Sequence, residues 1–149
     1  MADQTPMSRA LAQARAAATR GEVPVGAVLV GPDGAILAED GNRTREMRDP
    51  TAHAECLVIR TAAAALGSDR LTGCDLYVTL EPCPMCAAAI SYARIRRLYY
   101  GASDPKSGGI EQGPRIFSHP QAHHRPEIYS GIAEAEAAAI LKAFFAARR

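Results

Sequence analysis

The sequence predicts an α/β fold in which a mixed β-sheet lies between layers of helices. An apolar strand at residues 25–30 is followed by a Gly-Pro-Asp-Gly turn and a returning strand at 35–39, which predicts an antiparallel hairpin. After this hairpin, predicted helices and strands alternate along the chain, as they do where helices cover a sheet. At 149 residues the chain is long enough for one domain with a substantial core, so we expect residues 1–149 to form a single domain.

The first predicted helix is defined by its cap and its apolar stripe. It begins at Thr5-Pro6, an N-cap residue followed by a proline that suits the first turn, and it ends near Gly21. The polar segment 42–49 carries three arginines and is predicted to be a loop that leads to the next helix. The apolar stripe of the first helix consists of Met7, Ala10, Leu11, Ala14, Ala17 and Ala18.

The second helix is predicted over residues 52–66, with Thr51 as its N-cap. Apolar side chains lie nearly all round this helix, so we expect it to be buried. Residues 67–73 connect it to a strand at 75–80, and that strand leads into a third helix that opens with Cys83.

The last part of the chain is predicted to contain a strand at 96–102, a Gly-, Pro- and His-rich segment, a short strand at 127–129 and a long helix. One helical turn is predicted within the Gly-rich segment, near residues 114–118, and Ser130 is predicted to cap the last helix. The residues expected to face the core from this helix are Ala133, Ala137, Ile140, Leu141, Phe144 and Phe145.

Composition and charge restrict the function classes. No apolar run is long enough to span a membrane, and the first residues lack the basic and apolar regions of an export signal, so we expect a cytoplasmic protein. A formal net charge of +1 gives no general argument for nucleic-acid binding, so any basic surface must be local. Four cysteines, two of them in a metal-like pair, indicate cytosolic metal chemistry, with Cys56 and Cys74 interpreted as buried apolar residues.

Cys83 and Cys86 form a Cys-x-x-Cys pair at the predicted start of a helix. A spacing of three places both sulfurs on one face of the first turn, where free N–H groups and the helix dipole favour thiolates. Two converging thiolates are typical zinc ligands, and His53, in the first turn of the preceding predicted helix, is the best further donor. Three protein ligands leave a fourth position open, which is the pattern of a catalytic site.

Glu55 supplies the acid–base group that such a site needs. It lies about 200° round a helix from His53, so we do not expect it to be a fourth ligand, but it can reach a metal-bound water from the side. Zinc lowers the pKa of its bound water, and a nearby carboxylate can take the proton and pass it to a leaving nitrogen. Such an acid–base group contributes roughly 10² to 10⁴ in rate.

His53-Ala54-Glu55 together with Pro82-Cys83-x-x-Cys86 resembles the zinc-dependent deaminase signature H-x-E…P-C-x-x-C. Nearly the whole chain also resembles the bacterial tRNA-specific adenosine deaminases, which make inosine at the wobble position of an anticodon. The zinc motif is highly specific for the superfamily, and the other stretches are moderately specific for the tRNA enzymes. These other stretches are residues 22–29, 41–43, 49–55, 77–83, 94–95, 144–145 and 148–149.

The resemblance implies a three-layer α/β/α cytidine-deaminase-like fold, with a mixed five-stranded sheet between helices and the two metal-binding helices side by side. It implies one Zn²⁺ per subunit, held by His53, Cys83 and Cys86, and hydrolytic deamination of adenosine with Glu55 as the proton shuttle. It further implies a homodimer that completes the substrate cleft, a tRNA anticodon stem-loop as partner and no membrane.

The resemblance also implies contacts with the substrate. Asn42, whose amide offers both a donor and an acceptor, and the backbone of Ala54 are expected to contact the target base. Asp104 is expected to meet the nucleotides beside that base, although the same residue type also starts turns. The candidate RNA contacts are Arg94, Lys106, His123, Arg148 and Arg149.

Three alternatives remain open. The first is a small-molecule deaminase with the same zinc chemistry; a histidine ligand disfavours a cytidine deaminase, whereas guanine deaminases share it. The second is a zinc-stabilised binding module without turnover, against which Glu55 argues because a structural site has no use for an unligated carboxylate. The third is a noncatalytic subunit of an editing enzyme, which is disfavoured because such partners typically lack the glutamate.

Overall fold

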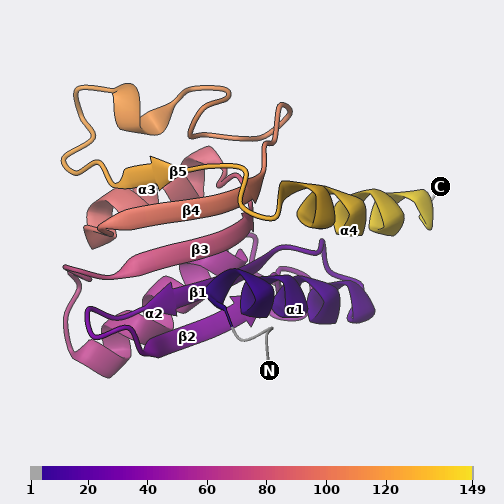
Figure 1. The fold of residues 1–149 in the computed structure, drawn as a ribbon, viewed down its shortest axis with the longest axis horizontal. Coiled ribbons are helices and arrows are strands. Elements are labelled where there is room, and N and C mark those ends of the chain that lie inside the picture. Colours follow the sequence, from indigo (N-terminus) through magenta and orange to yellow (C-terminus); the bar gives the residue numbers. More distant parts are fainter. Residues whose placement is uncertain (1–4, 149) are drawn as a thin grey trace.

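A five-stranded mixed sheet forms the middle layer of the structure, a computed structural model that describes residues 5–148 (Figure 1). The strand order is β2-β1-β3-β4-β5. β1 (Gly26–Val30) pairs antiparallel with β2 (Ile36–Gly41) and with β3 (Asp75–Leu80). β4 (Arg97–Ala102) then runs parallel to β3 and to the edge strand β5 (Glu127–Tyr129). The predicted mixed five-stranded sheet and its short last strand are therefore confirmed.

Two helices cover each face of this sheet (Figure 1). α2 (Ala54–Leu66) and α3 (Pro84–Ala93) lie side by side on one face. α1 (Pro6–Thr19) and α4 (Glu134–Ala146) lie on the other, and the 3₁₀ turn η1 (Ile116–Ser118) packs against α3. The three-layer arrangement and the paired metal-binding helices are both confirmed. No helix within residues 5–148 is long and apolar enough to cross a membrane.

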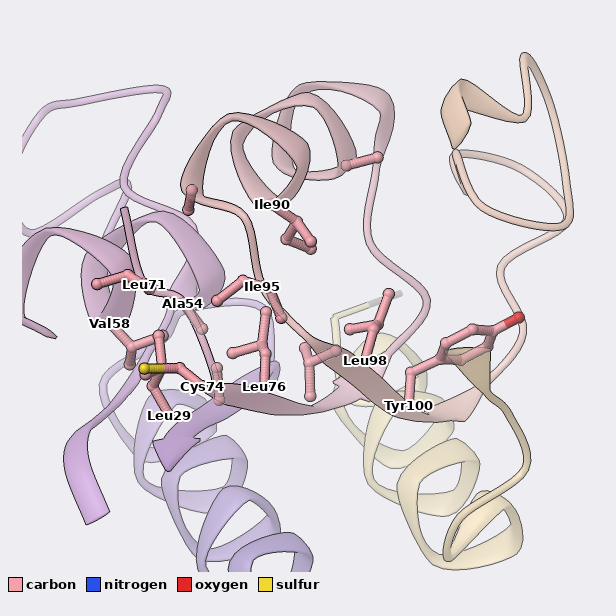
Figure 2. Close-up of a cluster of buried hydrophobic side chains, with 14 of the residues drawn as sticks. Leu29, Ala54, Val58, Leu71, Cys74, Leu76, Ile90, Ile95, Leu98 and Tyr100 are labelled. Carbon is pink, nitrogen blue, oxygen red and sulfur yellow. The ribbon is translucent and has the colours of Figure 1, made fainter. Parts of the chain in front are cut away.

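Two apolar clusters fill the spaces between the layers, because successive side chains of a strand point to opposite faces. Leu29 and Leu76 point toward α2 and α3, where they meet Val58 and Ile90 (Figure 2). Val28 belongs to the second cluster, against α1 and α4. All five residues of β1 are buried, as expected for a strand covered on both faces. The larger cluster fixes the positions of the two helices whose N-termini form the site.

Close packing of α1 against the hairpin fixes the start of the loop that follows β2. A Cβ atom at Gly26 would lie 1.9 Å from the carbonyl oxygen of Ala10, and one at Gly41 would lie 2.7 Å from that of Gln13. Only glycine permits this approach of helix and strand. Asn42 follows directly after Gly41, so this packing also sets where that amide lies.

The predicted N-cap of α2 is wrong. The helix begins at Ala54 with His53 as its N-cap, and not at Ala52 with Thr51. The Thr51 hydroxyl donates to the carboxylate of Asp49 at 2.7 Å and accepts from Arg60 at 3.1 Å, so it belongs to a turn that precedes the helix. The predicted burial holds only for the first half of α2, since Arg60 and most of the residues after it are exposed.

The predicted start and core face of α4 also need correction. The helix begins at Glu134, with Ala133 rather than Ser130 at its N-cap, because the chain first turns through Gly131 and Ala133, which have φ of 77° and 56°. Of the six residues expected in the core, Ala137 and Phe144 are buried, Ile140 and Leu141 are half-buried, and Ala133 and Phe145 are exposed. α4 extends past the end of the sheet (Figure 1), so part of its apolar face has no strand to pack against.

Candidate active site

The N-termini of α2 and α3 bring His53, Cys83 and Cys86 together. Their ligand atoms all lie within 4.8 Å of one another, and no other such group of His, Cys, Asp and Glu occurs among residues 5–148. His53 and Cys83 are the N-cap residues of their helices, one position before the first turn where the sequence predicted them, and Cys86 is the third residue of α3. Two helix starts that are 30 residues apart in sequence therefore present three donors to one point.

The separations of these atoms fit a tetrahedral zinc ion. His53 Nδ1 lies 3.6 Å from Cys83 Sγ and 3.5 Å from Cys86 Sγ. Tetrahedral zinc, with bonds of about 2.3 Å to sulfur and about 2.0 Å to nitrogen, places such a pair of ligand atoms about 3.6 Å apart. The donor set is thus already spaced for the ion.

The two thiols differ in their acidity. A hydrogen bond from Cys86, followed by one from His53, lowers the pKa of Cys83 to about 4 despite its partial burial. Hydrogen bonds to Cys56 and to Cys83, together with burial, raise the pKa of Cys86. Cys83 is therefore a thiolate at neutral pH, and Cys86 keeps its proton until a metal displaces it.

Glu55 lies beside this group, and one of its oxygens has no partner. The side chain is buried, with 4% of its surface exposed, and its Oε1 makes no hydrogen bond. Burial raises the pKa of Glu55 to about 7, against the opposing influence of a backbone hydrogen bond and of His53. A buried carboxyl oxygen without a partner is costly for folding, so its retention here indicates a role toward a ligand.

We call His53, Cys83 and Cys86 the metal-ligand group. A cavity of about 220 Å³ opens over this group, and we call it the site cavity. Its walls combine apolar side chains with polar groups from the two helix starts and from the loops after β2 and β4. The lining residues are Val23, Val25, Asn42, Thr44, His53, Glu55, Leu80, Glu81, Cys83, Asp104 and Ser107.

Asn42 is held in the cavity wall by the start of α2. Its Oδ1 accepts a hydrogen bond of 2.8 Å from the backbone N–H of Ala54. The orientation of the amide follows from this bond, because an N–H group can only face the oxygen. Asn42 therefore retains its Nδ2 group as a donor toward a molecule in the cavity.

The comparisons with known proteins agree with this geometry. Residues 1–102 match the family described as the cytidine and deoxycytidylate deaminase zinc-binding region. The chain is 63% identical to a tRNA-specific adenosine deaminase of Agrobacterium fabrum (strain C58 / ATCC 33970), over 100% of this chain and 98% of that relative. This chain belongs to the tRNA-specific adenosine deaminase family.

Two solved structures place this deaminase within its superfamily. A structure from work on A-to-I editing by tRNA:A34 deaminases at the wobble position of transfer RNA superimposes with a TM-score of 0.90, at 65% identity over 91% of this chain and 98% of that chain. A guanine deaminase from Bacillus subtilis superimposes less closely, with a TM-score of 0.66 and 35% identity over 99% of this chain and 94% of that chain. The protein is accordingly a zinc-dependent hydrolytic deaminase.

Zinc affinity of this deaminase should rise with pH. The hydrogen bond to Cys83 raises the pKa of His53 above its ordinary value of 6.5, so a proton occupies the ligand nitrogen until the pH exceeds that raised value. Metal must displace this proton and the one on Cys86, so the dissociation constant should fall as pH rises through and beyond about 6.5. Competition with a chromophoric chelator would measure it. An affinity that stays constant across this range would contradict the prediction, and His119→Gln, an exposed histidine, is the control.

Sequence reasoning missed two buried glutamates that anchor the loops around the cavity. Glu81 accepts hydrogen bonds at Oε2 from three consecutive backbone N–H groups, those of residues 110–112, at 2.9–3.1 Å. Its Oε1 accepts from the backbone N–H of Asp104 at 3.0 Å and from the Ser103 hydroxyl at 3.2 Å. Burial alone raises the pKa of Glu81, but these backbone bonds outweigh it and hold the pKa below the ordinary value.

Glu22 has the same role for the loop after β2. Its carboxylate accepts from the backbone N–H of Arg45 and Glu46, at 3.2 and 2.9 Å, and from the Thr44 hydroxyl. Burial raises the pKa of Glu22, and these hydrogen bonds reverse the effect and lower it overall. The signal in the sequence was a carboxylate at one end of an apolar strand, beside a segment whose backbone N–H groups need acceptors.

The remaining predicted contacts lie at three different places. Asp104 lines the cavity, and its Oδ1 also starts a turn by accepting from the backbone N–H groups of Lys106 and Ser107. The turn is confirmed, and the contact with nucleotides stays a prediction. Lys106 is exposed on the same loop. Arg148 lies over the Phe144 ring, 3.5 Å from its centre, in a groove of about 210 Å³ next to the cavity.

Two candidates lie away from the cavity. Arg94 follows the C-terminal end of α3, whereas the metal-ligand group is at the N-terminal end. His123 lines a separate hollow of about 300 Å³ with Tyr92. Arg149 lies outside the described residues.

Proposed function

We propose that this deaminase converts adenosine to inosine at the wobble position of a tRNA anticodon. The observation that carries the proposal is the 63% identity to the Agrobacterium fabrum enzyme over the full chain. The zinc-binding family match ends at residue 102, but this identity continues through the loop with Asp104 and the last helix. We also propose a single domain in the cytoplasm, where tRNA functions and where four free cysteines stay reduced.

In the proposed reaction, His53, Cys83 and Cys86 hold Zn²⁺ and Glu55 moves the protons. When bound, zinc lowers the pKa of a coordinated water, which makes it a nucleophile at neutral pH. Glu55 Oε1 would take one proton from the attacking water and deliver it to the ring nitrogen N1 as the water oxygen bonds to C6. It would then take the remaining proton of that oxygen and deliver it to the amino group, which leaves as ammonia when the C6–N bond breaks. The net change replaces the C6–NH₂ group by C6=O and consumes one water for each ammonia released.

The surroundings of Glu55 suit both halves of this proton transfer. A general acid–base group works best when its pKa is near the working pH, and burial raises the pKa of Glu55 to about 7. The partnerless Oε1 is the atom available to the transferred proton. The apolar walls formed by Val23, Val25 and Leu80 exclude bulk water from it.

We propose that Asn42 orients the base. Its Nδ2 donates to an acceptor nitrogen of the purine, while its Oδ1 stays bonded to Ala54. The backbone N–H of Ala54 thus takes part in base binding indirectly, because it holds the amide of Asn42 in this orientation. A purine reaches this wall only after leaving its stack in the anticodon loop, since the cavity admits a single base.

Nucleotides beside the target base would occupy the groove next to the site cavity. The groove shares Val23 and Thr44 with the cavity, so the two spaces are adjacent. Phe145 lines it with 49% of its surface exposed, and Arg148 adds a cation. An exposed aromatic ring beside an arginine is suited to a stacked base and its phosphate. Asp104 and Lys106 are proposed to extend the same RNA surface, and Arg149 stays a predicted RNA contact.

We propose that two copies form the homodimer through the outer face of α3. Tyr92 is 73% exposed there, beside the hollow that also contains His123. A ten-residue helix is about 15 Å long, so Arg94 lies that far from the metal-ligand end of its own α3. In this dimer, we propose that Arg94 and His123 contact RNA that is bound to the partner's cavity.

Arg94→Gly should stabilise the fold but weaken RNA binding. Arg94 has φ of 63°, a left-handed conformation that costs a non-glycine residue about 1 kcal/mol and costs glycine little. Thermal unfolding should therefore shift upward while KM for an anticodon stem-loop rises. Arg94→Lys, which keeps the charge, should retain KM. An unchanged KM in Arg94→Gly would contradict a role for Arg94 in RNA binding.

Inosine formation by the purified zinc protein tests the proposed function. The substrates are an anticodon stem-loop with adenosine at the wobble position, free adenosine, guanine and cytidine. We expect inosine from the stem-loop alone. Release of ammonia from guanine with the stem-loop unchanged would instead support the second candidate, which the 35% identity to guanine deaminase favours. In that case the proposed roles of the zinc centre and Glu55 remain, and the proposed RNA-binding role of the surface residues is wrong.

A further inference from the structure

Cys56 lies in direct contact with one of the metal-ligand sulfurs. Its Sγ is 3.8 Å from Cys86 Sγ, within the range of a hydrogen bond between sulfur atoms, and both side chains are buried. Cys56 is the third residue of α2, as Cys86 is the third residue of α3, so each helix start carries two soft donors three residues apart. The sequence interpretation of Cys56 as a small apolar residue does not account for this contact.

Cys56 stands outside the group that could hold the metal. Among residues 5–148, only His53, Cys83 and Cys86 have ligand atoms that all lie within 4.8 Å of one another. The contact of the Cys56 sulfur with this group is with Cys86, at 3.8 Å. This arrangement places it behind a ligand, where side chains commonly orient ligands and adjust their electron donation.

The direction of the hydrogen bond follows from the chemistry of the ligand. A cysteine that binds zinc does so as a thiolate and has no proton to donate. In the contact between the two sulfurs, Cys56 is then the only side with an S–H group. A second thiolate 3.8 Å from the first, beside the carboxyl of Glu55, would be opposed by like charges in a buried place.

We propose that Cys56 is a positioning residue that donates its S–H to the Cys86 thiolate and thereby reduces the electron donation of that ligand to the metal. Two thiolates neutralise much of the charge of zinc and weaken its action on water. A hydrogen bond to one of them restores part of that action. The inference rests on the proposed function, because it requires Cys86 to be a metal ligand.

Cobalt(II) in place of zinc reports on this hydrogen bond independently of activity. The full-length wild-type protein should show a thiolate-to-cobalt charge-transfer band. Cys56→Val keeps a similar volume but removes the donor, so the more electron-rich thiolate should move the band to lower energy. Cys56→Ser keeps a donor and should leave the band near the wild-type position. On the zinc protein, kcat for the stem-loop should fall about tenfold in Cys56→Val, with KM unchanged.

Cys74→Val is the matched control, because Cys74 is also buried but lies in the apolar core. It should leave both the band and kcat unchanged. An unmoved band in Cys56→Val would overturn the inference, and so would the loss of one thiolate's share of the intensity, which would make Cys56 a ligand itself. The absence of a thiolate band in the wild-type protein would contradict the proposed metal centre itself. An unmoved band in Cys56→Val would contradict only the role of Cys56, so the two results can be distinguished.

Discussion

Glu55→Gln is expected to abolish turnover while zinc remains bound and the fold intact. Glutamine has the size of glutamate but cannot carry a proton from the attacking water to the base. Loss of such an acid–base group lowers kcat by roughly 10² to 10⁴. Glu55 is not part of the metal-ligand group, so metal content should stay that of the wild type. Single-turnover inosine formation and metal analysis on the same sample would measure both.

The same substitution should stabilise the metal-free protein above neutral pH. Burial raises the pKa of Glu55 to about 7 in the fold, so the carboxylate form opposes folding once the pH exceeds its ordinary value of 4.5. This penalty grows between pH 4.5 and 7 and is complete above that, at up to roughly 3 kcal/mol for such a shift. Denaturant unfolding at pH 8 and at pH 4 should therefore show a difference between wild type and variant only at the higher pH.

An exposed carboxylate provides the control for both results. Glu127→Gln, on the edge strand, should change neither kcat nor the pH dependence measured for Glu55. Normal inosine formation by Glu55→Gln would exclude Glu55 as the proton shuttle. Loss of zinc together with activity would show that Glu55 contributes to the metal centre instead.

Glu81→Gln is expected to have the largest effect on stability outside the apolar core. The buried carboxylate accepts five hydrogen bonds, and an NH₂ group in place of one oxygen would face N–H donors that have no other acceptor. We expect the free energy of unfolding to fall by about 3–5 kcal/mol, since hydrogen bonds to a charged acceptor are lost and buried N–H donors are left without an acceptor. In a domain of this size, that corresponds to a melting temperature lower by roughly 10 °C.

The activity of Glu81→Gln should also fall, because the loop carrying Asp104 loses its anchor. A displaced loop changes the shape of the cavity wall, and we expect kcat/KM for the stem-loop to fall about 10- to 100-fold in protein that remains folded. Zinc affinity should stay near that of the wild type. Equal losses of zinc and activity would instead indicate a general collapse of the site.

The pH dependence of stability separates this anchor from ordinary surface carboxylates. The backbone hydrogen bonds hold the pKa of Glu81 below its ordinary value of 4.5, so the stabilisation is present above pH 4.5 and is lost as the pH falls through the lower folded value. Wild type and Glu81→Gln should therefore converge in stability in acid. Glu22→Gln should behave in the same way but disturb the loop with Thr44 rather than the one with Asp104.

Most of the fold could be predicted from local pattern. Local sequence located β3 and β5, and the cap at Thr5 was confirmed by its hydrogen bond from the Ser8 N–H. The errors fell at helix starts, where Thr51 and Ser130 looked like caps. Which residue caps a helix depends on where the chain turns into it. The turns at Asp49 and Gly131 depend on a side-chain hydrogen bond and on a backbone conformation, and residue propensities do not predict either of them.

The sequence by itself determined the chemistry of this protein. The sequence contains a histidine and a glutamate two residues apart and, at the start of another apolar helix, two cysteines three residues apart. The members of each pair lie within one helical turn, so the distance between them in space follows from the sequence separation. The candidate zinc ligands and the candidate acid–base group could be predicted for that reason.

Only the tertiary structure decided how these pairs meet and what surrounds them. The contact between Cys56 and Cys86, the bond between Asn42 and Ala54, and the loop anchored by Glu81 join residues 12 to 31 positions apart. No local periodicity encodes such contacts. They follow from strand order and from the packing of α2 and α3 on the sheet, which bring distant segments within hydrogen-bonding distance.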